Sequence, residues 1–171
     1  MPGSLSHLAS RFLDVLLARP LTPHERDRVS HWLPAPLYDL FGEQSQPDQR
    51  HGYQAALSVI ASGHTDEETV TAALTHDVGK RRAALGVIGR SMASVLILVG
   101  APMSKRMTIY RDHGSIGAID LERLDAPTLA VEYARHHHGE RPDSIPAETW
   151  DVLELADQPP KARTLIRARI R

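Results

Sequence analysis

The chain has 171 residues, a formal net charge of −1 and ten histidines, and it contains no cysteine. A charge this close to neutral gives no support to nucleic-acid binding. Without cysteine there can be no disulfide framework, thiolate zinc site or cysteine nucleophile, so a bound metal would need nitrogen and oxygen ligands. The sequence shows no cleavable signal segment, and its 42% apolar content is ordinary for one globular domain, so we expect a cytoplasmic protein.

The N-terminal part is predicted to be helical. Apolar residues recur at helical spacing over residues 5–17, which predicts a first amphipathic helix. Residues 22–25 are Thr-Pro-His-Glu, a pattern typical of a capped helix start. Two prolines within residues 34–36 predict a connection. No alternating β-branched runs occur anywhere in the chain, so the predicted fold class is all-α.

The next two predicted helices carry the first histidines and aspartates of interest. A helix over residues 47–62 places His51 on the same face as small and apolar residues, so His51 should face inward. Asp66 is a typical N-cap for the helix that follows. We expect the pair His76-Asp77 in the last turn of that helix and Gly79 as its break.

Residues 83–101 form a mostly apolar run with Arg90 near its middle. A central arginine costs about 2.5 kcal/mol or more in a bilayer, so we expect a buried helix and not a membrane span. Arg81 and Arg82, just before this run, are expected to be solvated. A connection should follow the run, because Pro102 cannot continue the helix.

The last predicted helices bring further histidines and one more aspartate. His113 should begin a helix that stops before Pro127. A helix over residues 126–137 ends in the run His136-His137-His138, and the final helix ends near Asp157.

Six histidines and two aspartates therefore lie on or at the ends of predicted helices. In chain order they are His51, His76, Asp77, His113, His136, His137, His138 and Asp157. Imidazoles and carboxylates together suit divalent iron, manganese, cobalt, nickel or zinc. A carboxylate at a helix C-terminus is unfavourable, and a bound cation would offset that cost at Asp77. The pattern favours a metal site.

This order, together with the segment His76-Asp77-Val78-Gly79-Lys80, resembles the HD-domain superfamily of metal-dependent phosphohydrolases over residues 47–160. The resemblance implies an HD-domain helical bundle in that range. Residues 1–46 would then be an N-terminal helical extension packed on the core, and residues 161–171 a basic C-terminal tail.

The same resemblance implies ligand roles and an activity. His51, His76, Asp77 and Asp157 match the superfamily's defining ligands, while His113, His137 and His138 extend the match to its two-metal subset, in which Asp77 bridges. One or two divalent ions would then produce a metal-bound hydroxide that hydrolyses a phosphoester or phosphoanhydride. The expected substrate is a phosphorylated small molecule, in particular a nucleotide, with no membrane or nucleic acid as partner.

Lys80, which joins Asp77 in the expected catalytic set, has two interpretations. It could place a cation by a substrate phosphate, or it could relieve exposed carbonyls at a helix end. The sequence leaves both open.

The substrate and the role of the site also have competing interpretations. Residues 139–146 lack the Gly-Tyr-Pro signature of the superfamily members that cleave cyclic dinucleotides, which argues against that substrate. A catalytically silent metal- or nucleotide-binding regulatory module would keep the same ligands without turnover, and a bundle with surface histidines would bind no metal. Histidines outside the pattern are expected on the surface, namely His7, His24, His31, His64 and His136.

Overall fold

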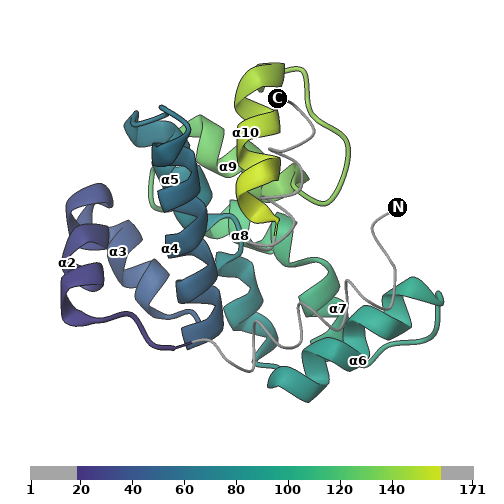
Figure 1. Ribbon diagram of the computed structural model, residues 1–171. Helices are drawn as coiled ribbons and strands as arrows, with labels where there is room; N and C mark the ends of the chain where they lie inside the picture. The colour runs from purple at the N-terminus through teal and green to yellow at the C-terminus, as the bar shows by residue number, and fades with distance from the viewer. Residues whose placement is uncertain (1–18, 159–171) are drawn as a thin grey trace.

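The computed structural model describes residues 19–158, and within that range it contains helices and no strand (Figure 1). The prediction of an all-α bundle is confirmed. The elements are α2 (Pro23–Trp32), α3 (Ala35–Gly42), α4 (Gln46–Ala61), α5 (Glu67–Thr75), the 3-10 helix η1 (Val78–Ala83), α6 (Val87–Leu98), α7 (Lys105–Arg111), α8 (His113–Glu122), α9 (Thr128–His136) and α10 (Ala147–Asp157). The helix predicted over residues 5–17 and the basic residues 161–171 lie outside the described range.

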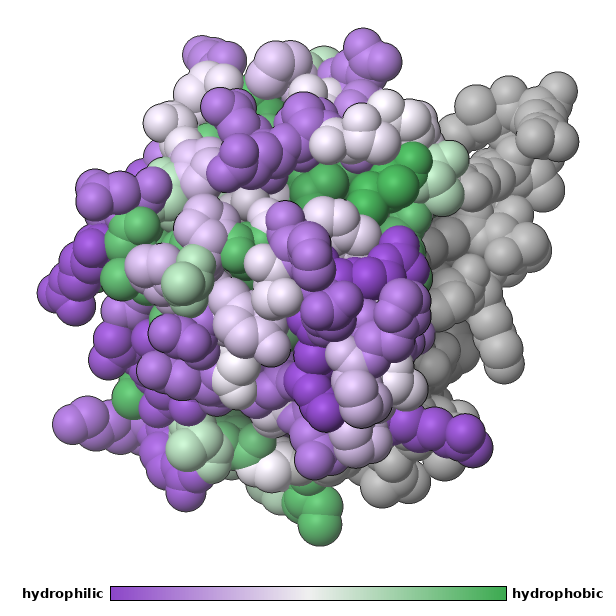
Figure 2. Space-filling view, turned by 90° about the vertical axis from the view of Figure 1, so that its left-hand side faces the viewer, coloured by the Kyte–Doolittle hydropathy of each residue, from purple (hydrophilic) through white to green (hydrophobic). Residues whose placement is uncertain are grey.

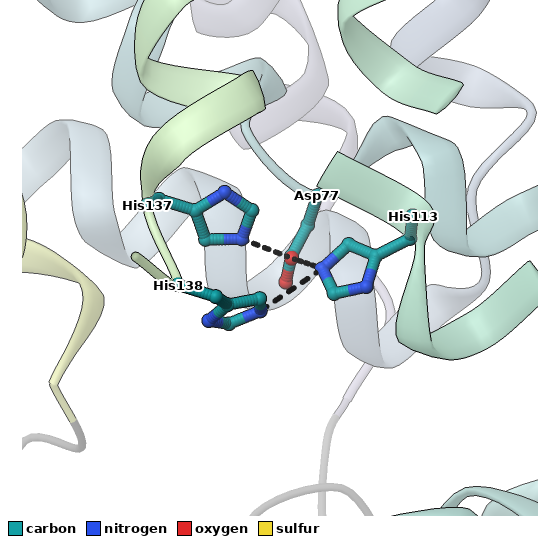
Figure 3. A group of neighbouring side chains, drawn as sticks. All are labelled: Asp77, His113, His137 and His138. Atoms are coloured by element: carbon teal, nitrogen blue, oxygen red, sulfur yellow. Dashed lines mark hydrogen bonds and ion pairs between the residues drawn. The ribbon is translucent and has the colours of Figure 1, made fainter. Parts of the chain in front are cut away.

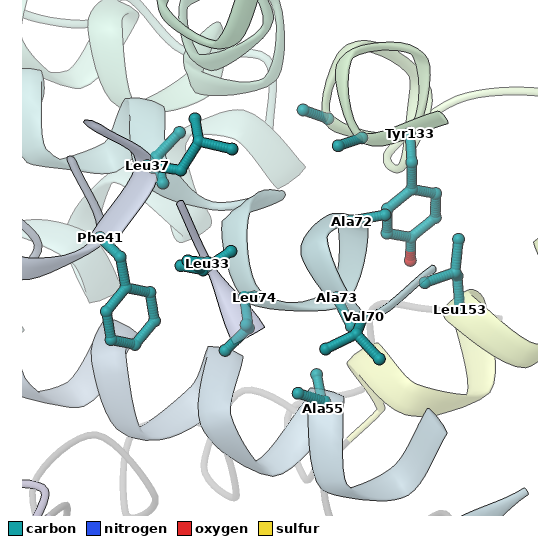
Figure 4. Close-up of a cluster of buried hydrophobic side chains, with 14 of the residues drawn as sticks. Leu33, Leu37, Phe41, Ala55, Val70, Ala72, Ala73, Leu74, Tyr133 and Leu153 are labelled. Atoms are coloured by element: carbon teal, nitrogen blue, oxygen red, sulfur yellow. The ribbon is translucent and has the colours of Figure 1, made fainter. Parts of the chain in front are cut away.

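Helix α5 lies at the centre of the bundle, packed against α4, α9 and α10, while α8 packs on η1 and α9. One continuous core joins these helices, and α2 contributes Val29 to it. Helix α3 contributes Leu37 and Phe41 (Figure 4). Burial of such apolar side chains is the main driving force for folding. The boundaries predicted at residues 46 and 160 stay predictions.

Two predicted helix starts are confirmed by their capping bonds. The hydroxyl of Thr22 accepts from the Glu25 backbone N–H at 3.2 Å, and the Glu25 carboxylate accepts from the Thr22 N–H at 2.8 Å. The Asp66 carboxylate accepts from the Thr69 N–H at 2.9 Å. Each bond satisfies a backbone donor that the helix itself leaves unpaired.

Three expectations for connections and exposure were wrong. Residues 34–36 start α3 instead of a plain connection, because Pro36 falls in the first turn, where a missing N–H costs nothing. Helix α7 occupies part of the connection expected after Pro102. Arg81 and Arg82 are not simply solvated, since both bind the Asp120 carboxylate and tie η1 to α8.

The apolar run at residues 83–101 also differs from expectation. Its helix, α6, is shorter than the run, and only one side of it is buried, with Arg90 and Ala93 inside and Ile88 and Met92 exposed. The Arg90 guanidinium donates to both Asp48 oxygens, at 2.6 and 2.8 Å, and so ties α6 to α4. No described helix is both long enough and apolar enough to span a membrane.

Close backbone contacts at glycines bring η1, α8 and α9 together. A Cβ atom on residue 79 would lie 2.0 Å from the His113 carbonyl oxygen, and a Cβ on residue 114 would lie 2.6 Å from the Ala134 carbonyl oxygen. Only glycine allows approaches this short. Gly79 is therefore not the helix break that the sequence predicted, since it lies inside η1 and serves packing.

We predict that Gly79→Ala lowers the free energy of unfolding by about 3 kcal/mol, because the methyl group would collide with backbone that cannot rotate away. Urea unfolding monitored by circular dichroism measures the change. Gly42→Ala is the matched control, since nothing lies within 4 Å of the added Cβ. It should leave stability unchanged or raise it by up to about 1 kcal/mol. Equal effects of the two variants would contradict the packing role of Gly79.

Candidate metal centre

Asp77 lies at the junction of α5 and η1. Helix α5 ends at Thr75, His76 is its C-cap, and Asp77 precedes the first residue of η1 with φ −97° and ψ 3°. The prediction that His76 and Asp77 occupy the last turn of the helix was therefore wrong by one to two residues. The chain tightens into a 3-10 helix here, which places the Asp77 carboxylate at the start of η1 and removes the helix-dipole conflict expected for it.

One group of side chains surrounds the Oδ1 atom of Asp77 (Figure 3). The Nε2 atom of His113 lies 3.1 Å from it and that of His137 lies 3.5 Å from it. The Nε2 atom of His138 lies 3.2 Å from His113 Nε2. The structure thus brings His137 and His138 together with His113, whereas half-buried His136 belongs to neither group of potential metal ligands found in the described chain.

A second group faces the other oxygen of Asp77. The Nε2 atoms of His51 and His76 lie 3.9 and 3.6 Å from Asp77 Oδ2. The same two nitrogens lie 2.7 and 3.2 Å from Asp157 Oδ1, at the end of α10. All seven ligands predicted from the sequence therefore lie in one cluster, and Asp77 stands between its two halves.

Hydrogen bonds to backbone carbonyls fix the ring orientation of three of the histidines. His76, His113 and His137 each donate Nδ1–H to the carbonyl three residues earlier, at 3.1, 2.6 and 2.8 Å. A carbonyl oxygen can only accept, so the Nδ1 atom carries the hydrogen and each Nε2 is left free to accept a proton or a metal. Hydrogen bonds of this kind orient histidine ligands in metal sites. The sequence could not reveal them, because the acceptors are main-chain atoms.

Burial and neighbouring charges shift the pKa values of three groups in the cluster, His113, Asp77 and Asp157. Burial, helped by the charge of Lys80, lowers the pKa of His113, which favours a neutral ring. Burial opposes ionisation of Asp77, but Lys80 and the histidines outweigh it and hold the Asp77 pKa well below its usual range. Burial likewise opposes ionisation of Asp157, and its contacts with His51 and His76 outweigh burial and hold its pKa well below the usual range. The carboxylates are charged at neutral pH.

One buried nitrogen atom of the cluster is left without a hydrogen-bond partner by the described residues. The Nε2 atom of His137 is inaccessible to solvent and has no hydrogen-bond partner in the described structure. An unpaired buried polar atom costs about 1–3 kcal/mol. A divalent cation between this nitrogen and Asp77 Oδ1 would satisfy both, so the residues present fit a metal site.

Lys80 is buried and its ammonium group donates to Asp77 Oδ2. Its Nζ atom also lies 5.9 Å from the centre of the Tyr110 ring, an arrangement that favours a cation. Neither interpretation drawn from the sequence anticipated a lysine bound to the central carboxylate. The contact supplies one positive charge to a buried anion that would otherwise be costly.

Tyr133 lines the inner side of the cluster and was not singled out in the sequence. Its ring centre lies 5.9 Å from those of both His76 and His137. Its buried hydroxyl has no hydrogen-bond partner in the described chain. Helical periodicity does not distinguish a core tyrosine from one beside a site, so no pattern in the sequence could single out Tyr133. Of the histidines expected on the surface, His24 and His31 are exposed, His64 is half-buried and His7 lies outside the described residues.

We predict a characteristic pH dependence of stability for the metal-free protein. Below the ordinary histidine pKa of 6.5, the unfolded chain binds a proton at His113 that the folded chain does not, so stability is lost as pH falls. For this group the free energy of unfolding should decrease by up to about 1.4 kcal/mol per pH unit. Urea titrations with a chelator between pH 7 and pH 5 measure the slope. The aspartates titrate at lower pH and contribute little in this window.

His113→Asn should make this slope shallower, while His24→Asn, at an exposed position, should leave it as in the unmodified chain. Identical slopes for all three proteins would contradict a neutral, buried His113.

Comparison of the chain with protein-family models, with curated proteins and with solved structures found no match. The function must therefore be inferred from the geometry of the cluster.

Proposed function

We propose that the chain is a metal-dependent phosphohydrolase of the HD-domain type, acting on a nucleotide or a related phosphoester or phosphoanhydride. The observation that carries the proposal is the arrangement around Asp77. Each of its oxygens faces two histidine Nε2 atoms, and one of these, on His137, is buried without a partner. The resemblance of the motif order to the HD superfamily adds the phosphate chemistry.

The ligand set divides into two halves that share Asp77. His51, His76 and Asp157 would hold one divalent ion with Asp77 Oδ2, and His113, His137 and His138 would hold a second with Oδ1. Such ions, when bound, acidify water and neutralise charge on phosphoryl oxygens. Imidazole and carboxylate ligands accept iron, manganese, cobalt, nickel or zinc, so occupancy would depend on supply as well as affinity.

Differences in exposure indicate the side from which a substrate approaches. His76 and His137 are buried, whereas the His51 side chain is 26% exposed and His138 is exposed. The exposed members therefore form the accessible edge of the cluster. A phosphate group approaching this edge would contact the exposed ligands, His51 and His138. On the opposite side of the cluster, the packing of Tyr133 and α5 would exclude water.

Lys80 is proposed to act on the substrate as well as on Asp77. Its ammonium group lies in the same buried cluster and is a compact cation of the kind that binds phosphate. When divalent ions neutralise Asp77, the lysine would be available to a phosphoryl oxygen. The cytoplasmic location expected from the sequence stays a prediction.

We predict that Asp77→Asn removes bound metal and lowers hydrolysis by more than about 100-fold, because the amide keeps the shape of the side chain but loses the shared charge. Elemental analysis should find about one or two ions per unmodified chain and none in the variant. Hydrolysis is measured on an aryl phosphate and a nucleotide panel with added manganese, iron, cobalt, nickel or zinc.

Asp112→Asn is the matched control, since it makes the same change on the residue before His113, where the carboxylate is exposed and pairs with Arg111. Metal content and hydrolysis should match the unmodified chain. Metal bound without turnover of any substrate would instead support a silent regulatory module, and absence of metal from every variant would contradict both.

We predict that Lys80→Met retains the metal, because all seven ligands remain, and lowers kcat by about 100-fold, the typical cost of losing one charged group that stabilises a transition state. Parallel measurements of metal content and kcat separate the two effects. Unchanged kcat with tighter metal binding would mean that Lys80 only balances the charge of Asp77.

A further inference from the structure

Helix α6 has its polar and apolar sides reversed relative to an ordinary surface helix, which turns its charged residues outward. Its one charged residue, Arg90, is buried and bound to Asp48. The side facing away from Arg90 carries an apolar stripe of Ile88, Met92, Val95 and the C-cap residue Val99, which are 75%, 51%, 47% and 64% exposed. The face shown in Figure 2, on the side of α2 and α3, is by contrast hydrophilic over most of its area. A contiguous row of exposed apolar side chains marks an interaction surface.

The stripe lies apart from the metal centre. Helix α6 packs on α7, and the two helices lie together at one edge of the bundle (Figure 1). The residues of the metal cluster come from α4, from α8, α9 and α10 and from the junction of α5 with η1, and none of them lies on α6. A contact made through the stripe would therefore be independent of the metal chemistry.

The spacing of the stripe is the same when it is read in either direction. Its members follow one another at intervals of four, three and four residues, which is the spacing of a helix–helix seam. If two copies of α6 lay antiparallel about a two-fold axis, Ile88 would face Val99 of the second copy and Met92 would face its Val95. The same two pairs would then recur on the other side of the axis. A two-fold interface requires this reciprocity, because one surface must be complementary to itself.

We propose that the stripe binds the same stripe of a second copy of the chain, so that two antiparallel α6 helices form the contact of a two-fold dimer. The stripe and its neighbour Leu98, which is 55% exposed, offer roughly 500 Å² of apolar surface per copy, or about 1,000 Å² per pair. That total is about the smallest that a specific interface needs, whereas obligate dimers bury about 2,000 Å² or more. The dimer is therefore a reversible one.

The charges of α6 favour a second copy over a lipid surface. Helices that lie on membranes carry exposed lysine and arginine beside their apolar face. The only charged residue of α6 is Arg90, which is buried against Asp48 and cannot reach a lipid headgroup. The stripe itself carries no charge, so two copies of it meet without like-charge repulsion.

Sedimentation velocity of the full chain over about 1–100 µM tests the proposal, and the unmodified chain should show a monomer–dimer equilibrium in that range. Met92→Glu places a charge in the seam and should raise the dimer Kd at least about tenfold. Ile119→Glu is the matched control, since Ile119 is 45% exposed but lies on α8. The control should dimerise like the unmodified chain. Circular dichroism and urea titration verify that each variant is folded.

The antiparallel pairing has a test of its own. Val95→Lys alone should also weaken the dimer. An equimolar mixture of the Met92→Glu and Val95→Lys chains should associate at least about threefold more tightly than either variant alone, because the introduced carboxylate of one chain would face the introduced ammonium of the other. A mixture that associates no better than the single variants would overturn the antiparallel pairing.

Two other outcomes would overturn the dimer itself. One is an unmodified chain that stays monomeric over the whole concentration range. The other is a monomer that binds phosphatidylglycerol vesicles and loses this binding in Met92→Glu, which would assign the stripe to a lipid surface.

Discussion

The buried carboxylate of Asp77 is the group on which the arrangement of the cluster depends. Taking an anion out of water costs several kcal/mol unless positive charge and hydrogen bonds replace the solvent. Here Lys80 in η1 donates to Asp77 directly, while His113 in α8, His137 after α9 and His51 in α4 bring imidazole Nε2 atoms toward the two oxygens of the carboxylate. Each must approach within about 4 Å of one side chain. The packing of the bundle around α5 follows from that requirement as much as from the apolar core.

Backbone atoms, more than side chains, make such convergence possible. Gly79 and Gly114 let η1, α8 and α9 approach at distances that any Cβ would forbid. Carbonyls three residues before His76, His113 and His137 then turn each ring so that Nε2 points inward. A metal site built on these helices would be preorganised, since neither the helix positions nor the ring orientations depend on a bound ion.

The identities of the cluster residues were predicted from the sequence more accurately than the backbone geometry around them. Widely spaced histidines and aspartates at helix ends could be recognised because ligand type and order survive in the sequence, and Thr22 and Asp66 marked their helices correctly. The end of α5 could not be placed, because the shift to a 3-10 helix after Thr75 depends on contacts with α8 that no local pattern contains. The exposure of α6 was missed for a similar reason: an apolar run has the same composition whether its outer face is covered or bare.

Asp48 and Asp77 are both buried, but their hydrogen-bond partners differ. This difference distinguishes a structural carboxylate from a candidate metal ligand. Two nitrogens of the Arg90 guanidinium and the Ser45 hydroxyl donate hydrogen bonds to Asp48, so each of its oxygens already has a donor. A cation is not needed to satisfy this carboxylate. Asp77 has one ammonium donor on Oδ2, while its Oδ1 faces imidazole nitrogens whose lone pairs also point inward. Two sets of acceptors facing each other across about 3 Å require a shared cation or a proton. Burial alone would have marked both aspartates as candidate ligands, and the pairing of their oxygens selects Asp77.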